Sequence, residues 1–438
     1  MNLSKKYESF GRYPQLSIKK VETISWKDEL YKSIKSESSF LPRGFGKSYG
    51  DSCLVNNSTL IDTTNLNHLI DFDENSRIIE AEAGIQFSTL LDFLVSRKSF
   101  LPVTPGTKYI SLAGAIANDV HGKNHHDKGT FGNHVIEIEL LRSNGELVTC
   151  SLEKNSDLFK ATIGGLGLTG VITKAKFKNI AIDNPYLYVE NIKFRNLDEF
   201  FEVNSSSIKK FPYTVAWVDT TSEGKNFGRG IYNRGFFTNA NTPNVPKNDL
   251  KASLIPFPID YPFINNFSVK AFNMLWYNKQ LMNHQKVISH YNPFFYPLDM
   301  IDGWQKSYGK NGFLQYQFVI DEKKGRKILP KIFKEITTSG LSSFLVVLKT
   351  FGYIESPGML SFPRPGITLA IDFRMTNKTL ALLDSLDKYI IELGGRLYPA
   401  KDARMKPEHF KQFYPNWREF AQFKDPKISS AFWERVTK

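Results

Sequence analysis

The stretch "PRGFGKSYGD", residues 42–51, places three glycines among cationic and hydroxyl side chains. Its Gly-Lys-Ser core is how the phosphate loop of a nucleoside triphosphatase ends, but the first glycine of that loop would fall at Leu41. A dinucleotide fingerprint would need its third glycine one place before Gly50 and a helix after it, where loop and strand are expected instead. Main-chain N–H groups of a glycine loop can still bind phosphate without a helix. A phosphate site and a tight structural connector therefore both stay open.

Two further segments, residues 103–135 and 164–173, are also dense in small side chains. In the first segment these are Gly106, Ser111, Gly114, Ala115 and Ala117. Small side chains let a large ligand lie directly against the main chain. Three such segments in one region favour an extended ligand over three unrelated connectors.

The overall composition is that of a globular protein with anionic partners. The chain has 438 residues, 41% of them hydrophobic and 23% charged, enough for two or three domains. Its formal net charge of +13 favours nucleic acid, an anionic membrane surface or a phosphorylated substrate. No basic helix, zinc finger or RNP-type strand occurs, so we expect no nucleic-acid partner.

Cysteine content and hydropathy limit the possible fold type and cellular location. Cys53 and Cys150 are the only cysteines, which excludes a disulfide framework and a cysteine-only metal cage. The N-terminus lacks the apolar core of a signal peptide, and no segment reaches the ~18 apolar residues of a membrane span. We expect a protein that is cytoplasmic or peripheral to the inner membrane.

Hydrophobic periodicity predicts alternating strands and helices in the first 180 residues and a different texture afterwards. Residues 234–270 are rich in Pro, Phe and Asn and are predicted to form a long lid that touches lipid, or a packed irregular loop. The predicted strands are 58–64, 77–84, 134–151 (a hairpin), 170–180, 313–320, 342–352 and 366–375, and the predicted helices are 87–100, 156–165 and 378–395.

The order of the glycine motifs resembles a known family. "RGFGKSYGD", "PVTPGT", "AGAIANDVHGKNHH" and "GGLGLTGVI" follow one another as in the FAD-binding half of vanillyl-alcohol oxidase (PCMH-type) flavoproteins. "HGKNHH", "FLQYQFVI" and "GGRLYPAKDAR" are similar to motifs of the decaprenylphosphoryl-β-D-ribose 2′-oxidase family within that superfamily. The resemblance covers nearly the whole chain and is weakest at the N-terminus and in residues 234–270.

This resemblance implies an α+β fold. A PCMH-type FAD-binding domain of two α/β subdomains would span residues 1–182 and be completed by 396–438. A substrate-binding domain, with an antiparallel sheet covered by helices, would span 183–395 and carry the flexible lid at 234–270.

The resemblance also implies where FAD binds. Sugar-lactone and alditol oxidases of the superfamily carry in this loop a His that bonds covalently to the flavin, and this chain has Lys47 there. We therefore expect non-covalent FAD. The implied FAD-binding residues are Pro42, Arg43, Gly44, Phe45, Gly46, Lys47, Ser48, Tyr49, Gly50, Asp51, Ser52, Gly106, Ser111, Leu112, Ala113, Gly114, Asn118, Asp119, Val120, His121, Ile172 and Tyr398.

The catalytic residues implied by the resemblance are Lys401, Tyr49 and His121. Lys401 is expected to act as a base through a lowered pKa, or as a cation beside the reduced flavin. Taken without its motif, Lys401 would be read as a surface lysine. The implied substrate-binding residues are Lys123, Gln317, Lys349, Thr368 and Lys401, with Lys123 a candidate for the substrate phosphate.

Two details qualify this site. His121 and His125 have a spacing that can chelate a metal on a helix, but no Glu stands in the zinc-protease position and no other ligand cluster is evident, so we expect no metal. In "GITLAIDF", Thr368 and Ala370 replace the Asn and Cys of the mycobacterial pattern, so the reaction is not expected to need a thiol there.

The predicted function is FAD-dependent oxidation of the 2′-hydroxyl of a polyprenyl-phosphoryl pentose to the 2′-keto sugar. This would be the first half of an epimerisation to the arabinose form for cell-envelope glycan synthesis, completed by a short-chain-dehydrogenase-type reductase at a membrane surface. One alternative is a soluble sugar or aldonolactone oxidase of the same superfamily. Another is a non-catalytic basic scaffold or nucleic-acid-binding protein.

Overall fold

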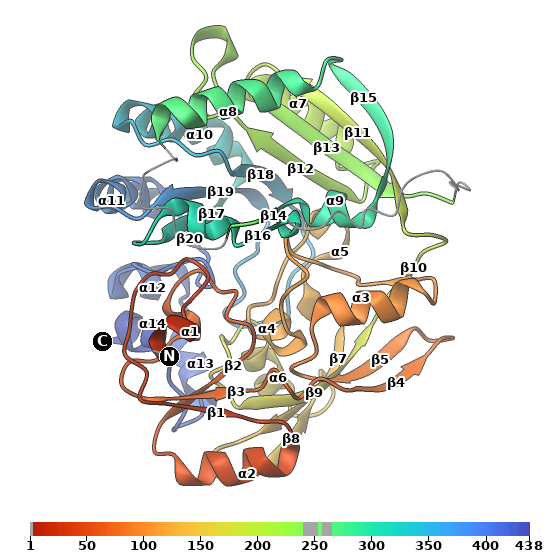
Figure 1. The fold of residues 1–438 in the computed structure, drawn as a ribbon, viewed down its shortest axis with the longest axis vertical. Helices are drawn as coiled ribbons and strands as arrows, with labels where there is room; N and C mark the ends of the chain where they lie inside the picture. Colours follow the sequence, from red (N-terminus) through yellow and green to blue (C-terminus); the bar gives the residue numbers. More distant parts are fainter. Residues whose placement is uncertain (1–2, 240–252, 256–264) are drawn as a thin grey trace.

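The computed structural model describes residues 3–239, 253–255 and 265–438. Two layers of structure are stacked along its longest axis (Figure 1). One layer combines the first 181 residues with the C-terminal helices, and the other is built around a large antiparallel sheet. The predicted α+β fold is confirmed.

A small parallel sheet starts the first layer. Strands β1 (Lys20–Thr23), β3 (Thr59–Asp62) and β2 (Phe40–Arg43) pair in that order, and helix α2 (Lys27–Ser36) connects β1 to β2. All four residues of β3 are buried. Because β2 ends at Arg43, its pairing with the central strand β3 fixes the point at which the glycine loop leaves the sheet.

An antiparallel sheet of five strands follows, in the order β4 (Leu69–Asp73), β5 (Ile78–Glu82), β9 (Val171–Lys178), β7 (Val135–Leu141) and β8 (Leu147–Cys150). The predicted hairpin at 134–151 is therefore present as β7 and β8. Helix α3 (Phe87–Val95) buries its apolar stripe in this core, as helical spacing requires. The short elements nearby are β6 (Ser99–Phe100), β10 (Ile180–Ala181), α1 (Leu3–Lys6), α4 (Leu112–Ala117), α5 (His125–Lys128) and α6 (Ser156–Thr162).

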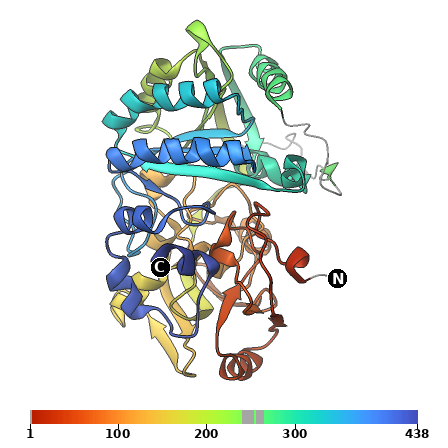
Figure 2. The same cartoon turned by 90° about the vertical axis from the view of Figure 1, so that its left-hand side faces the viewer.

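The second layer is one antiparallel sheet of eight strands. Their order is β15 (His284–His290), β11 (Tyr186–Phe194), β13 (Gly230–Phe237), β12 (Tyr213–Val218), β18 (Val346–Phe351), β19 (Gly366–Arg374), β17 (Phe313–Ile320) and β20 (Arg396–Leu397). Helices α7 (Leu197–Ser207), α10 (Glu322–Ser339) and α11 (Asn377–Glu392) cover its outer face (Figure 2).

Alternation along the strands gives the two faces of this sheet different chemistry. In β17, Leu314, Tyr316, Phe318 and Ile320 belong to the apolar core shared with the covering helices. Gln315 and Gln317 point to the opposite face, because successive side chains of a strand alternate. A polar inner face is thus turned toward the first layer.

The segment predicted as a lid is shorter at both ends. Residues 234–237 belong to β13, and residues 266–270 belong to helix α8 (Asn266–Lys279). Between them the structure describes only 238–239, 253–255 and 265, where β14 (Ser253–Leu254) pairs with β16 (Ile301–Asp302). The rest of the predicted lid lies outside the described residues.

The C-terminal segment returns to the first layer as α12 (Pro407–Phe413), α13 (Trp417–Phe423) and α14 (Ala431–Thr437). The predicted domain division stays a prediction. At its second boundary, Arg396 and Leu397 still pair with β17 of the large sheet. α9 (Tyr291–Phe295) completes the helices of the described residues.

Arg435 of α14 ties this returning segment to the glycine loop. Its guanidinium binds both carboxylate oxygens of Asp51 at 2.8 and 2.9 Å and Asp402 Oδ2 at 2.9 Å. Gly50 lies so close to this segment that a Cβ there would fall 1.7 Å from the Asp402 carbonyl oxygen. The loop and the segment after β20 therefore hold one another in place.

Replacing Arg435 with Met should destabilise the fold by leaving two buried carboxylates without their partner. We expect the free energy of unfolding in urea to fall by about 3 kcal/mol. The control, Arg418→Met, removes an exposed guanidinium from α13 and should change it by less than about 0.5 kcal/mol. An equal decrease in the free energy of unfolding in both variants would contradict a stabilising role for the Arg435 ion pairs.

Candidate active site

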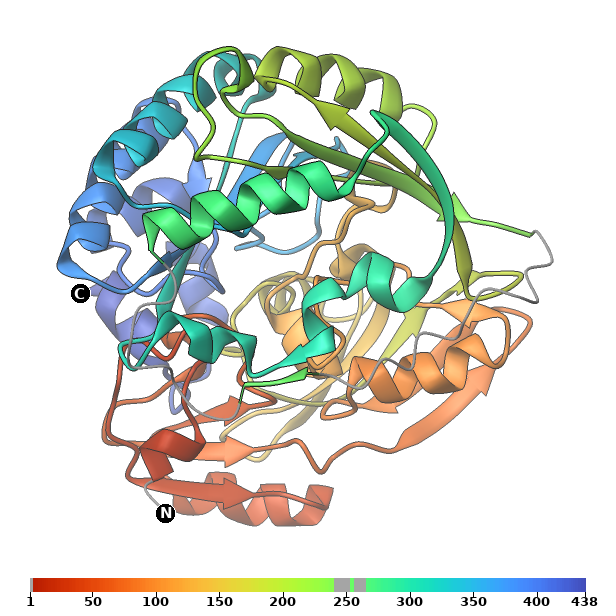
Figure 3. The ribbon, with the colours of Figure 1, turned by 45° about the horizontal axis from the view of Figure 1, so that its top comes forward.

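A cavity of about 1920 Å³ lies between the glycine segments and the inner face of the eight-stranded sheet. Ligand pockets are commonly ~300–1,000 Å³, so this one has room for a cofactor and a substrate together. Helix α8 and the segment 291–308 lie across the front of the molecule (Figure 3). Residues of both contribute to the cavity wall.

Most of the predicted FAD-binding residues line this cavity and are brought together from four chain segments. The glycine loop contributes nine of them, and the second and third small-residue segments and the C-terminal segment contribute the rest. They are Pro42, Arg43, Gly44, Phe45, Gly46, Lys47, Ser48, Tyr49, Ser52, Gly106, Ser111, Ala113, Gly114, Asn118, Val120, His121, Ile172 and Tyr398.

Four predicted contact residues do not line the cavity. Gly50 and Asp51 face the C-terminal segment, as described above. Leu112 is fully buried in the apolar core around α4. The Asp119 carboxylate is buried and accepts a hydrogen bond of 2.9 Å from the N–H of Gly132. These four residues support the loops rather than form the cavity surface.

The cavity floor has the chemistry that FAD requires. A Cβ at Gly106 or Gly167 would meet no atom within 4 Å, so bare main chain faces open space there. Ser52 Oγ and His121 Nδ1, on the same wall, are buried without a hydrogen-bond partner among the described residues. Open main chain with unused polar atoms fits a large flat ligand that carries phosphate and ring nitrogens.

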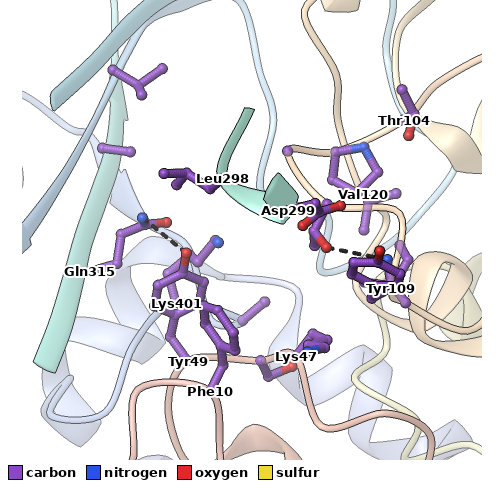
Figure 4. A pocket seen from close by; sticks show the side chains of 18 of the residues that line it. Phe10, Lys47, Tyr49, Thr104, Tyr109, Val120, Leu298, Asp299, Gln315 and Lys401 are labelled. Carbon is purple, nitrogen blue, oxygen red and sulfur yellow. Dashed lines mark hydrogen bonds between the residues drawn. The ribbon is translucent and has the colours of Figure 1, made fainter. Parts of the chain in front are cut away.

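Lys401, Tyr49 and Gln315 form a cluster in the cavity wall (Figure 4). Lys401 Nζ lies 3.6 Å from the centroid of the Tyr49 ring. Gln315 Nε2 donates to Tyr49 Oη at 3.3 Å and to Asp372 Oδ1 at 2.6 Å. The amide of Gln315 thus joins the Tyr49 phenol to the Asp372 carboxyl group, and the Tyr49 ring in turn lies against the amine of Lys401.

Burial decides the protonation of the predicted catalytic residues. It raises the pKa of Tyr49 well above its usual value, so this phenol stays protonated and is no base at neutral pH. It lowers the pKa of His121 far below its usual value, so the ring is neutral. Burial also lowers the pKa of Lys401, and the nearby Asp372 carboxylate opposes that shift. Of the three, only Lys401 can change protonation near neutral pH.

His121 has a defined tautomer. Gln317 Nε2 lies 3.1 Å from His121 Nε2, and because an amide nitrogen can only donate, the ring nitrogen accepts. The proton of the neutral ring is therefore on Nδ1, the atom without a partner. His121 offers one free donor to whatever occupies the floor.

All five predicted substrate-binding residues line the cavity, and Gln317, Lys349 and Thr368 do so from strands of the large sheet. Strand pairing sets Lys349 beside Thr368, and Gln317 Nε2 donates to Thr368 Oγ1 at 3.2 Å. Lys349 Nζ donates to the Gly122 carbonyl at 3.1 Å, and Lys123 Nζ donates to a carbonyl of α9. Burial lowers the pKa of both Lys123 and Lys349 to about 7.

Sequence reasoning missed Gln315 and Asp372. Both follow from the alternation of β17 and β19, since Gln315 shares a face with Gln317 and pairs with Asp372 in register. It also missed an aromatic wall made of Trp217, Phe272, Trp276 and Phe344. Only the sheet pairing and the placement of α8 reveal that wall.

His125 and His126 take no part in a metal cluster. His125 Nδ1 accepts from the N–H of Gly352, and His126 Nε2 lies 2.9 Å from the carbonyl of Phe211. In the part of the chain that is described, no group of three His, Cys, Asp or Glu side chains is placed to hold a metal ion.

The two small sheets, the glycine floor and the large sheet above it define the class of FAD-binding oxidoreductases. Residues 29–151 match the family model described as an FAD binding domain. Decaprenylphosphoryl-beta-D-ribose oxidase of Mycolicibacterium smegmatis is 35% identical over 396 residues, 88% of this chain and 85% of that protein. The chain belongs to the decaprenylphosphoryl-β-D-ribose oxidase family of FAD-dependent oxidoreductases.

More distant relatives share parts of the chain. An uncharacterized protein of Streptomyces coelicolor is 28% identical over 76% of this chain and 93% of its own length. D-arabinono-1,4-lactone oxidase of Kluyveromyces lactis is 27% identical over 46% of this chain and 42% of its own. The predictions of an oxidoreductase and of FAD as its cofactor are confirmed.

FAD should leave this protein without breaking a covalent bond. Lys47 occupies the position in the loop where a flavin-linking His would stand, and its Nζ lies 5.2 Å from the Phe10 ring centroid. Acid precipitation of the purified holoprotein should release the yellow colour into the supernatant. Colour that stays in the pellet would contradict non-covalent binding.

Proposed function

We propose that this protein oxidises the 2′-hydroxyl of a polyprenyl-phosphoryl pentose similar to decaprenylphosphoryl-β-D-ribose, using non-covalently bound FAD. The observation that carries this proposal is a pair of half-buried lysines, Lys123 and Lys349, that line the cavity. Neither forms an ion pair with a described residue, and partial removal of an unpaired cation from water is unfavourable, which lowers the pKa of both lysines. An anionic phosphate on the substrate would supply the missing partner.

The aromatic wall supports a substrate with an apolar chain. Phe272 and Trp276 stack with ring centroids 6.0 Å apart, and Phe272 packs edge-on against Phe344 at 5.8 Å. Leu345 and Val347 extend the wall toward the lysines. A polyprenyl chain lying along this wall would leave water while its phosphate lies near the lysines.

The proposed reaction divides into two transfers. FAD supplies the acceptor for the hydride that leaves the 2′ carbon. The neutral amine of Lys401 takes the proton of the 2′-hydroxyl, and the product is the 2′-keto sugar. Tyr49, whose ring lies against Lys401 Nζ, and Gln315, which donates to the Tyr49 hydroxyl, would position Lys401 and the sugar hydroxyls.

The cavity residues of the glycine segments are proposed to hold FAD, with the pyrophosphate in the 42–52 loop, Ile172 toward the adenine and Tyr398 against the flavin. Gln317, Lys349 and Thr368 are proposed to face the sugar. A separate short-chain-dehydrogenase-type reductase would convert the keto sugar to the arabinose form for cell-envelope glycan synthesis, and the enzyme would work in peripheral contact with a membrane.

The similarity to D-arabinono-1,4-lactone oxidase supports a second candidate, a soluble aldonolactone oxidase. That similarity covers less than half of the chain. A small lactone has neither a phosphate for the two lysines nor a chain for the aromatic wall. The polyprenyl-phosphoryl substrate uses both features.

The direct test mixes the holoenzyme anaerobically with synthetic polyprenyl-phosphoryl ribose. We expect the flavin absorption band to bleach, and to bleach at least ~100-fold more slowly in Lys401→Met because general-base transfer is lost. Lys406→Met, at an exposed position, is the control. Bleaching by D-arabinono-1,4-lactone alone would favour the second candidate, and rapid bleaching in Lys401→Met would remove Lys401 from its role.

Asp372→Asn should move the pH profile of flavin reduction. Burial raises the pKa of Asp372 to about 7, and in its ionised form this carboxylate raises the pKa of Lys401. Its replacement therefore lowers the pKa of Lys401 and leaves the amine neutral at lower pH. We expect the acidic limb of the profile to shift down by about one pH unit. Asp384→Asn, near the surface, should leave it in place. An unmoved limb in Asp372→Asn would show that Lys401 does not titrate in this limb.

A further inference from the structure

Helix α8 presents an apolar face that no described part of the chain covers. Phe267 is 85% exposed and Leu275 is 68% exposed, and Met274 lies between them on the same side. Met274 and Leu275 follow Phe267 by seven and eight positions, about two helical turns, so the three side chains lie on one face of the helix. The loop after the helix continues this surface with Leu281, 92% exposed, and Met282. We call Phe267, Met274, Leu275, Leu281 and Met282 the α8 face.

The helix is firmly attached by its opposite side. Val269 and Asn273 are buried, and Asn273 Nδ2 donates to Asp219 Oδ1 at 2.9 Å and to the Ser343 carbonyl at 3.3 Å. α8 lies on the other side of the large sheet from the helices α7, α10 and α11 (Figure 2). Its exposed side chains are therefore displayed by a fixed element, next to the cavity.

The α8 face is continuous with the cavity wall. Phe272 and Trp276, one turn apart on the neighbouring side of the same helix, line the cavity and are themselves partly exposed. Leu275 of the α8 face lies three positions after Phe272, so these two side chains are neighbours on the helix surface. The helix thus connects the outer surface to the site at which the apolar part of the substrate is proposed to lie.

The charge of this segment selects the partner. Residues 265–298 contain the three lysines Lys270, Lys279 and Lys286 and no Asp or Glu. Lys270 is exposed and has only a 3.9 Å pair with an exposed glutamate, and Lys279 lies beside the Trp276 ring. Apolar side chains flanked by lysines on a surface helix fit the headgroup region of an anionic bilayer.

We propose that the α8 face docks on an anionic lipid bilayer and brings the mouth of the cavity to the membrane surface. This inference rests on the proposed function, because it explains how a chain anchored in the bilayer reaches the aromatic wall. The protein would lie on the membrane surface, since no helix in the described residues is long and apolar enough to cross a bilayer.

The test measures co-sedimentation of the purified full-length holoprotein with substrate-free vesicles. We expect binding to vesicles of phosphatidylglycerol and phosphatidylcholine, and weaker binding to phosphatidylcholine alone or in high salt. Phe267→Ser, Leu275→Ser and Leu281→Ser combined should lower the partition coefficient by roughly tenfold or more. The matched control combines Ile70→Ser, Leu152→Ser and Tyr353→Ser, which are also exposed apolar positions, and should bind as the unaltered protein does.

Two results would overturn the docking surface. One is equal binding by the α8 variant and the unaltered protein. The other is no binding to either vesicle, which would assign the α8 face to a protein partner instead. Flavin reduction by a water-dispersed short-chain polyprenyl-phosphoryl ribose is measured in parallel and should be unchanged in the α8 variant. If the unaltered protein binds vesicles but its flavin is not reduced by this substrate, the proposed function is refuted and the docking surface is retained.

Discussion

Three lysine side chains, Lys123, Lys349 and Lys401, line one cavity and are each half-buried, and the arrangement of the site follows from the unfavourable free energy of removing their charge from water. Lys123 and Lys401 both lower the pKa of Lys349 through repulsion, in addition to burial. Asp372 is the carboxylate that opposes the shift at Lys401. A fold that maintains such a cluster is stabilised when an anion binds beside it. The binding of a phosphate is therefore linked to the protonation of these lysines.

The fold makes this cluster possible by bringing distant segments to the same space. Lys123 lies in the second small-residue segment, Lys349 lies on β18, and Lys401 follows β20. The close approach of Gly50 to the segment after β20 sets Lys401 above the Tyr49 ring. Rigid strands and a glycine-dependent contact thus hold groups that would repel one another in a flexible protein.

Much of this architecture could be predicted from local sequence signals. The strand of residues 313–320 is found with those bounds, and the hairpin at 134–151 and the helix at 378–395 are found within a few residues, because their periodicity is strong. The glycine segments contain most of the residues that line the floor of the cavity. Asp51 and Asp119 were assigned to the cofactor from their place in the motif, but a motif does not tell which way a side chain points. Both turn away to bind Arg435 and Gly132.

The parts that could not be predicted depend on contacts between distant residues. Asp372 acquires its role from strand pairing with Gln315, and each residue alone has an ordinary sequence context. The aromatic wall combines α8 with β12 and the residues before β18. The long irregular segment predicted at 234–270 gave no sign of the helix that begins at its end, because Pro and Asn, which are typical of turns and loops, are frequent in it.

The most direct measurement of the central claim is the number of protons taken up when the FAD-loaded protein binds polyprenyl-phosphoryl ribose under non-turnover conditions, such as with a 2′-deoxy analogue. Calorimetry at pH 8 in buffers of different ionisation enthalpy gives this number. Because Lys123 and Lys349 have pKa values of about 7 in the free protein, they are mostly neutral at pH 8, and an approaching phosphate raises those values. We predict net uptake of about one proton per bound ligand. Binding without proton uptake would contradict the account.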